Sequence, residues 1–163
     1  MELKLDAVAM NIPAGANLIL GRAHFIKTAE DLYEALVNTV PGIKFGLAFS
    51  EASGPYLVRC EGNDAPLREA AANNALAIGA GHFFVILVQN AFPINLLSRI
   101  REVPEVCEIV CASANPVQVI VARSAQGGGV LGVIDGSSPK GVETPGDAEE
   151  RRKLVRKFGY KLS

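Results

Sequence analysis

Apolar and polar positions follow two rhythms along the chain, the two-residue period of strands and the three-to-four-residue period of helices. The first predicts strands over residues 2–10, 17–25, 43–50, 56–60, 82–88, 106–112, 117–123 and 130–134. The second predicts helices over residues 28–40, 63–78, 93–101 and 147–158. Strands that alternate with helices of this length indicate a layered α/β architecture.

Signals at the segment ends support this division. Thr28 is expected to cap the first helix, which Pro41-Gly42 ends, and Asn63-Asp64 to cap the second. Residues 83–88 are continuously apolar, as in a strand buried on both faces. The link between 117–123 and 130–134 is too short for a crossover, so this pair must be antiparallel and we expect one mixed central sheet.

Composition agrees with one self-supporting domain over residues 1–163. Of the 163 residues 49% are hydrophobic and 20% are charged, which provides a large core and excludes disorder. We find no internal repeat and no linker. The charge is nearly balanced, with 16 Lys and Arg against 17 Asp and Glu, and Trp is absent. A nucleic-acid partner is therefore not expected.

The sequence also indicates a compartment. The N-terminus lacks the apolar stretch of a secretory signal, and the longest apolar run is far shorter than the ~20 residues of a membrane helix. The three cysteines, Cys60, Cys107 and Cys111, have no CxxC spacing and are interpreted as free thiols. We expect a cytoplasmic protein without a membrane partner.

A glycine-rich segment is the most visible motif. Residues 127–132 match GxGxxG, but a strand follows where the dinucleotide motif needs a helix. Segments of the protein-kinase type and a Walker A sequence are also missing. The remaining interpretations are a plain tight turn, or a hairpin in which backbone N–H groups of Gly127 and Gly129 approach a phosphate.

Two histidines are candidates for chemistry. His24 joins a strand to a helix start and is followed by Lys27 and Thr28, a combination suited to holding a phosphate. His82 begins the buried strand. Histidine can accept a phosphoryl group on nitrogen and titrates near neutrality. The alternatives are a solvated loop at His24 and a hydrogen-bonded core residue at His82.

Acidic and polar residues at strand ends complete the candidates. Glu51, within the segment that includes Ser53 and Gly54, and Asp135, followed by Gly136, each end a predicted strand. Such carboxylates suit a Mg²⁺–phosphate site, and Asn115 is a candidate for a contact to the base or ribose. The plain interpretations are a surface Glu, an Asp-Gly turn and an Asn-Pro turn.

Taken together, these segments resemble the adenosine-specific kinase family. The similar stretches, in order along nearly the whole chain, are HFIKTAEDLYEALVNTVPGIKFGLAFSEASG, GND, AGHFFVI, PINLLSRI, EVCEIVCASANPVQVIVA, LGVIDG and the final GYK. Two positions depart from the family pattern: Ser50, where Cys is common, and Gly128, where Arg is common in the glycine loop. The second departure is expected to weaken a phosphate contact at that loop.

The resemblance implies a three-layer α/β sandwich that assembles into trimers or larger oligomers, such as hexamers. It also implies a pocket for ATP, ADP or AMP and a histidine that carries a phosphoryl group. His24 and His82 both lie in similar stretches, and the neighbouring Lys27 and helix start favour His24.

Two functions follow as hypotheses. In the first, the chain is an ATP-dependent phosphotransferase that acts through a phosphohistidine, with Lys27 and a Mg²⁺ ion held by Glu51 or Asp135 neutralising the phosphates. In the second, the same pocket senses or buffers adenosine nucleotides without turnover. A purely structural oligomer is less favoured, because His, Lys, acids and glycines gather at predicted element ends.

Overall fold

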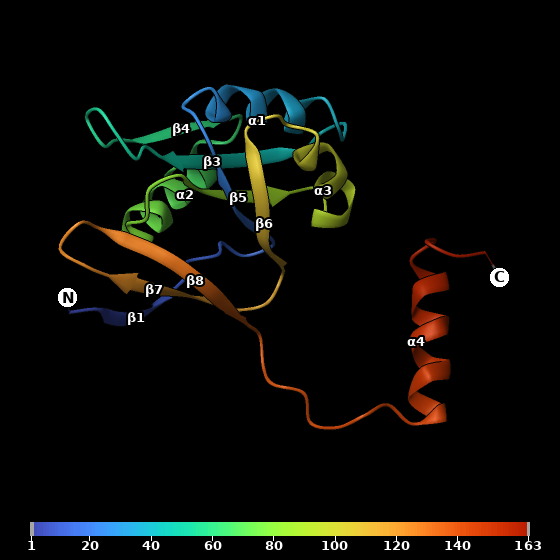
Figure 1. Ribbon diagram of the computed structural model, residues 1–163. Coiled ribbons are helices and arrows are strands. Elements are labelled where there is room, and N and C mark those ends of the chain that lie inside the picture. The colour runs from blue at the N-terminus through green and yellow to red at the C-terminus, as the bar shows by residue number, and fades with distance from the viewer. Residues whose placement is uncertain (1, 163) are drawn as a thin grey trace.

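Two β-sheets form the frame of the molecule, which a computed structural model describes for residues 2–162 (Figure 1). The strands are β1 (Lys4–Ala9), β2 (Asn17–Ala23), β3 (Lys44–Ser50), β4 (Val58–Gly62), β5 (Phe83–Gln89), β6 (Val106–Ser113), β7 (Val117–Arg123) and β8 (Gly128–Asp135). The helices are α1 (Thr28–Val37), α2 (Ala65–Ile78), α3 (Pro93–Arg101) and α4 (Pro145–Lys157). The elements expected from the sequence are all confirmed, with ends that differ by a few residues.

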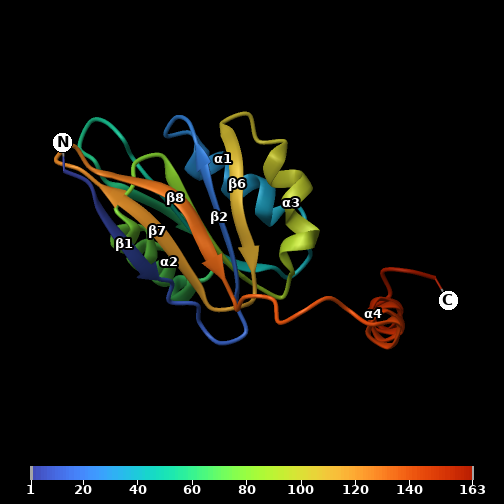
Figure 2. The ribbon, with the colours of Figure 1, turned by 60° about the horizontal axis from the view of Figure 1, so that its bottom comes forward.

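The elements stack in three layers. The five-stranded sheet, in the order β4-β3-β5-β2-β6, lies in the middle. Helices α1 and α3 pack on one face of it, around a cluster that includes Leu32, Phe45 and Leu96. Helix α2 and the three-stranded sheet β1-β7-β8 cover the other face, around Leu67, Val85 and Val119 (Figures 1 and 2). The α/β sandwich is thereby confirmed.

One detail of the expected sheet is corrected. In place of one mixed sheet there are two sheets, and every strand pairing within them is antiparallel. The crossover through α1 does join two strands that run the same way, β2 and β3. However, β5 lies between them and runs antiparallel to both. Alternation along the sequence reveals crossovers, but it does not reveal which strand is inserted between them.

Strand β5 is the centre of the core. Its residues from Phe83 to Val88 are at most 2% exposed, as expected for a strand covered on both faces. The next strands on either side, β2 and β3, are buried along most of their length. Because these three strands are packed in one continuous core, their ends are held in place, and so are the residues from which the connecting loops begin.

Helix α2 comes unusually close to the sheet. A Cβ atom built at Gly46 in β3 would lie 2.1 Å from the backbone nitrogen of Arg68 and 2.2 Å from the carbonyl carbon of Leu67. These are backbone atoms, so no side-chain rotation can relieve the clash. Glycine at position 46 therefore sets the spacing between α2 and β3.

The expected cap at the first helix is corrected. Lys27 occupies the cap position of α1, and no side chain caps the helix there. Thr28 is instead fully buried, and its hydroxyl donates to the carbonyl oxygens of Phe25 at 2.6 Å and His24 at 3.4 Å. The hydroxyl thus holds the loop that precedes α1, and does not satisfy the free N–H groups of the helix.

The end of the chain forms an arm. The expectation that the chain has no linker is corrected, because an extended segment after Gly136 carries α4 away from the two sheets (Figures 1 and 2). The cap of α2 agrees with expectation, since Asp64 accepts from the backbone N–H of Leu67.

Within residues 2–162 we find no helix with the length and apolar character that crossing a membrane requires.

The Gly46→Ala substitution is expected to destabilise the protein by about 1–3 kcal/mol or more, because the new methyl group meets helix backbone. Gly132→Ala is the matched control, since a Cβ there meets nothing within 4 Å, and it should leave stability nearly unchanged. Denaturant unfolding of both variants measures the difference. Equal stability would show that α2 moves away from β3 without cost.

Candidate functional site

The two histidines lie together at one edge of the five-stranded sheet, the edge formed by the ends of its central strands. His24 follows the end of β2, and His82 precedes β5, the strand paired with it. Their rings meet edge to face, with centroids 5.6 Å apart. The fold therefore brings together two candidates that are 58 positions apart in the sequence.

Backbone hydrogen bonds fix both histidines. The N–H of His82 donates to the carbonyl of Ser50 at 2.8 Å, and its own carbonyl accepts from Ala23 at 3.0 Å. The N–H of His24 donates to the carbonyl of Glu105 at 2.8 Å. The ring of Phe49 stacks on that of His82, with centroids 5.8 Å apart. The imidazoles are thus held from the ends of β2 and β3 and from the approach to β6.

The backbone at this edge is strained. His82 has a φ of 58° and Phe25 a φ of 83°, in the left-handed region that residues with a Cβ rarely adopt. Each such residue costs on the order of 1–3 kcal/mol and persists only where its surroundings enforce it. Such strain often occurs at functional sites, so it supports the assignment of this edge as the site.

An ion-pair cluster with one buried carboxylate, that of Glu105, lies beside His24. The Nζ atom of Lys27 is 2.5 Å from a carboxylate oxygen of Asp31 and 2.6 Å from Oε1 of Glu105. The side chain of Glu105 is only 6% exposed, and its Oε2 atom is buried without a hydrogen-bond partner. Hydrogen bonds to Asp31 and then Glu105 raise the pKa of Lys27, and the bond from Lys27 lowers the pKa of Asp31. Lys27 therefore already balances two carboxylates.

Sequence reasoning missed Glu105. It is one of many acidic residues, it stands in an ordinary loop after Pro104, and no motif surrounds it. Only the pairing of β6 with β2 brings its carbonyl to His24 and its carboxylate to Lys27. No local signal in the sequence predicts that juxtaposition.

A cleft of about 600 Å³ runs from this edge toward the three-stranded sheet. Glycines are prominent among the residues that line it, and the polar lining residues include Ser50, Glu51, Ser124 and Gln126. Neither histidine lines the cleft, but His82 directly follows the lining residue Gly81, and its backbone N–H donates to the lining residue Ser50. The glycine residues that line the cleft are Gly79, Gly81, Gly127, Gly128 and Gly129.

The glycine segment forms the expected hairpin. Ser124 donates to the carbonyl of Gly127 at 2.9 Å across the turn, and β7 and β8 pair on either side. A Cβ at Gly128 would lie 2.5 Å from the carbonyl oxygen of Gly79, with which the hairpin makes contact through the bridge from Ala80 to Gly128. Gly128 therefore permits this close approach of the hairpin to residues 79–80 in this chain.

Comparison with known proteins shows the family to which the chain belongs. A sequence model of the family described as "Adenosine specific kinase" matches residues 8–161. The chain belongs to the adenosine-specific kinase family. A crystal structure of the PH1918 protein from Pyrococcus horikoshii OT3 is similar over 99% of this chain and 100% of that one, with 47% identity and a TM-score of 0.96. No curated protein matches.

The family assignment supports a kinase-like function related to adenosine. It agrees with a site where two histidines lie next to a cleft that is lined in part by glycines. The remaining candidate residues of this adenosine-specific kinase family member fall into two groups, one beside the cleft and one at the opposite end of β8.

Glu51 lies beside the cleft but is already engaged. Its Oε2 accepts from the backbone N–H of Leu57 at 2.9 Å, and its Oε1 accepts from Arg59. These bonds, that from Leu57 first, lower the pKa of Glu51. Its carboxylate thus holds the β3–β4 loop, whose exposed turn contains Ser53 and Gly54.

Asp135 lies far from Glu51. Its Oδ1 accepts from Ser113 at 2.5 Å and from Asn115 at 3.3 Å, and the N–H of Gly136 donates to Pro116. This turn is at the end of β8 that is opposite the glycine hairpin, and an eight-residue strand spans about 23 Å. The two carboxylates that the sequence suggested for Mg²⁺ therefore do not share a site in this chain. Within residues 2–162 no cluster of three or more His, Cys, Asp or Glu suits a metal.

The Lys27→Met substitution should destabilise the protein, because it leaves the buried Glu105 carboxylate without its counter-charge. The double variant Lys27→Met, Glu105→Gln should recover part of the loss, since the buried charge is then removed as well. Denaturant unfolding gives the free energy of unfolding of the wild type, of both variants and of Glu105→Gln, which together form a double-mutant cycle. Strictly additive losses would mean that the ion pair does not couple these residues.

The Glu51→Gln substitution should lower the melting temperature at neutral pH. The folded-state pKa of Glu51 is lowered from 4.5, so its carboxylate stabilises the protein above that pH and loses this effect as the pH falls through the lower folded value. The difference from the wild type should therefore shrink below about pH 4.5. Glu69→Gln, an exposed change on α2, is the control. A constant difference at all pH values would contradict this role.

Proposed function

We propose that the chain is an ATP-dependent phosphotransferase that forms a phosphohistidine on His24 or His82. The pair of histidines 5.6 Å apart, with His82 directly after the cleft residue Gly81, carries this proposal. A volume of about 600 Å³ suits a nucleotide-sized ligand. The family assignment, with its adenosine-related name, gives the ligand class.

The chemical step needs one unprotonated imidazole nitrogen. Its lone pair attacks the γ-phosphorus of ATP, the bond from that phosphorus to the bridging oxygen breaks, and ADP leaves with the electron pair. An acceptor oxygen later attacks the same phosphorus, and the electrons of the N–P bond return to the imidazole as the acceptor loses its proton. Histidine is suited to both steps because its lone pair is available near neutral pH.

The chain's own residues would mainly position the reactants. The glycine hairpin and residues 79–81 line the cleft, and backbone N–H groups of such glycine-rich segments suit phosphate oxygens. Phe49 stacks on His82 and restricts its ring. Lys27, expected from the sequence to neutralise phosphate, is paired with Asp31 and Glu105, and we assign it to holding the loop that carries His24. The paired Glu51 and the distant Asp135 do not form a magnesium site, so no step is assigned to a metal held by the protein.

The engagement of Lys27 and Glu51 favours one alternative. With both charges already paired, the same cleft would bind AMP, ADP or ATP as a sensor without turnover. Asn115 and Asp135 lie away from this cleft in either case, so the proposed contact of Asn115 to a nucleotide would require a second copy of the chain.

We further propose a homo-oligomer, trimeric or hexameric, in the cytoplasm. The cysteines support a reducing compartment, since Cys60, Cys107 and Cys111 are all free. The exposed arm supports association with further copies.

Incubation with γ-labelled ATP and Mg²⁺ should label the wild type with acid-labile, alkali-stable phosphate. The label should disappear in either His24→Ala or His82→Ala, whichever residue is phosphorylated, because the N–P bond cannot form. Asn73→Ala, an exposed change on α2, should keep the label.

Nucleotide binding by calorimetry is measured on the same samples. Label that persists in both single histidine variants would overturn the phosphohistidine step. Folded wild-type protein that binds ATP but takes no label would support the sensor instead.

A further inference from the structure

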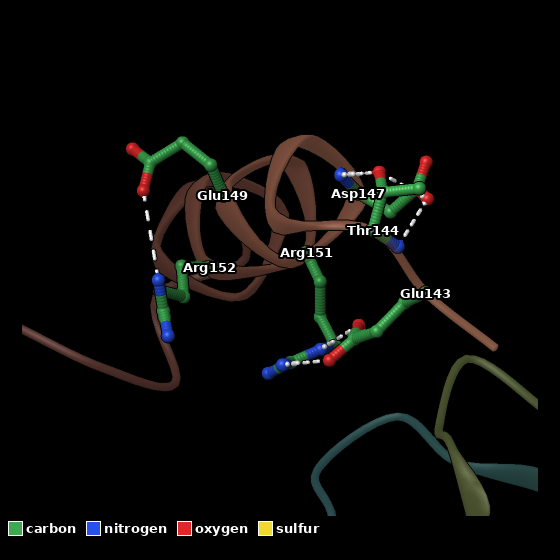
Figure 3. Close-up of polar contacts among 6 residues, drawn as sticks. All are labelled: Glu143, Thr144, Asp147, Glu149, Arg151 and Arg152. Carbon is green, nitrogen blue, oxygen red and sulfur yellow. Dashed lines mark hydrogen bonds and ion pairs between the residues drawn. The ribbon is translucent and has the colours of Figure 1, made fainter.

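The arm, residues 137–162, makes its polar contacts within itself. Figure 3 shows these contacts: Thr144 and Asp147 form a reciprocal cap, Glu143 pairs with Arg151 at 2.7 Å, and Glu149 lies 3.8 Å from Arg152. No residue of α4 is buried. Both ribbon views show the helix separated from the sheets (Figures 1 and 2).

Helix α4 presents an unpartnered apolar stripe. Leu154 and Phe158 are four positions apart, and Val155 and Ala148 lie seven apart on the same side. Leu154 is 49% exposed and Phe158 63% exposed. A helix of 13 residues is marginal in water on its own, even when it is capped. Packing of the stripe against a surface outside the arm would therefore stabilise the helix.

The arm leaves the body in the same direction in the PH1918 crystal structure. It makes up about a sixth of the chain. The two structures superpose over 99% of the chain with a TM-score of 0.96, a value that could not be reached if a sixth of the residues were placed differently. The extended arm is thus shared by two proteins that differ at about half of their positions, which favours a structural role for it.

A second unpartnered apolar surface lies on the three-stranded sheet. The residues on its outward side are almost all apolar, although antiparallel sheets with a solvent face usually alternate apolar and polar positions. Leu5 is 64% exposed and Leu131 67% exposed, and Leu5 pairs with Ala122 across the strands. We name this surface the outer sheet face, and its residues are Leu5, Ala7, Ile120, Ala122, Leu131 and Ile134.

Charge favours contact between an arm and a body. Residues 137–162 carry seven Lys and Arg against four Asp and Glu. Residues 1–136 carry nine Lys and Arg against thirteen Asp and Glu. Arms are thus net positive and bodies net negative, so an arm is attracted to a body and two arms repel each other.

We propose that the apolar stripe of α4 packs on the outer sheet face of a second copy of the chain. The inference deepens the homo-oligomer proposed above and does not depend on phosphotransfer. It pairs the two exposed apolar surfaces, and a helix on a sheet is a common way to bury both. Ala122 and Gly129 pair on this face and also line the cleft, so the partner's helix would border the nucleotide site.

Sedimentation equilibrium of full-length variants tests the contact. The arm variant Leu154→Glu, Phe158→Glu and the sheet variant Leu131→Glu should each weaken association at least 100-fold while the body stays folded by circular dichroism. The control Asn73→Glu, Ser98→Glu adds two charges at exposed positions on α2 and α3, outside the arm and the outer sheet face, and should associate as the wild type does.

Each outcome decides a different point. A monomeric wild type would overturn the homo-oligomer itself, whatever the labelling experiment shows. An arm variant that stays assembled while Leu131→Glu dissociates would overturn the arm contact and indicate sheet-to-sheet packing.

Cross-linking provides an independent test. In a background with the exposed Cys107 changed to Ser, Leu154→Cys in one chain and Leu131→Cys in another should form a disulfide-linked dimer after mixing. Each variant alone should give much less of it. If the mixture gives no more covalent dimer than the separate variants, the proposal is overturned.

Discussion

Strand β5 is the constraint on which the rest of the structure depends. It is covered on both faces, so each of its residues from Phe83 to Val88 must be apolar, and both of its neighbours must supply apolar side chains as well. The antiparallel pairing of β2 and β3 with β5 then fixes where these strands end. Since β2 and β3 end at the edge where β5 begins, His24, Ser50 and His82 meet there. The site is a consequence of the sheet order.

Close backbone approach is the second determinant. Gly46 lets α2 lie against β3, and Gly128 lets the hairpin of the three-stranded sheet reach the carbonyl of Gly79. A side chain at either position would push two layers apart. The two glycines therefore set the spacing of the layers around the cleft, which is lined by further glycines and by apolar side chains such as Leu57 and Leu76. A lining of this kind suits a ligand with both apolar and polar parts.

Charged groups near the site mostly hold the protein together. Glu51 is bound to Leu57 and Arg59, and Lys27 balances Asp31 and the buried Glu105. The Lys27 pairs fix the loop that carries His24, and the Glu51 contacts fix the β3–β4 loop. Positioning of the imidazoles by backbone bonds and by these loops is thus more prominent than charge neutralisation. The apolar stripe of the arm and the outer sheet face are both exposed, and in our proposal they pack against each other between two copies of the chain.

The sequence by itself determined the α/β class, nearly every helix and strand, the buried character of β5, the family and the two histidines. These follow from local periodicity, turn residues and ordered motifs, which depend on neighbours a few positions apart. Tertiary structure alone decided that β5 lies between β2 and β3, that Glu105 joins Lys27, that Asp135 is remote from Glu51, and that α4 stands apart from the body. These features depend on which strands pair and which surfaces pack, and such contacts between distant positions leave no periodic trace in a single chain.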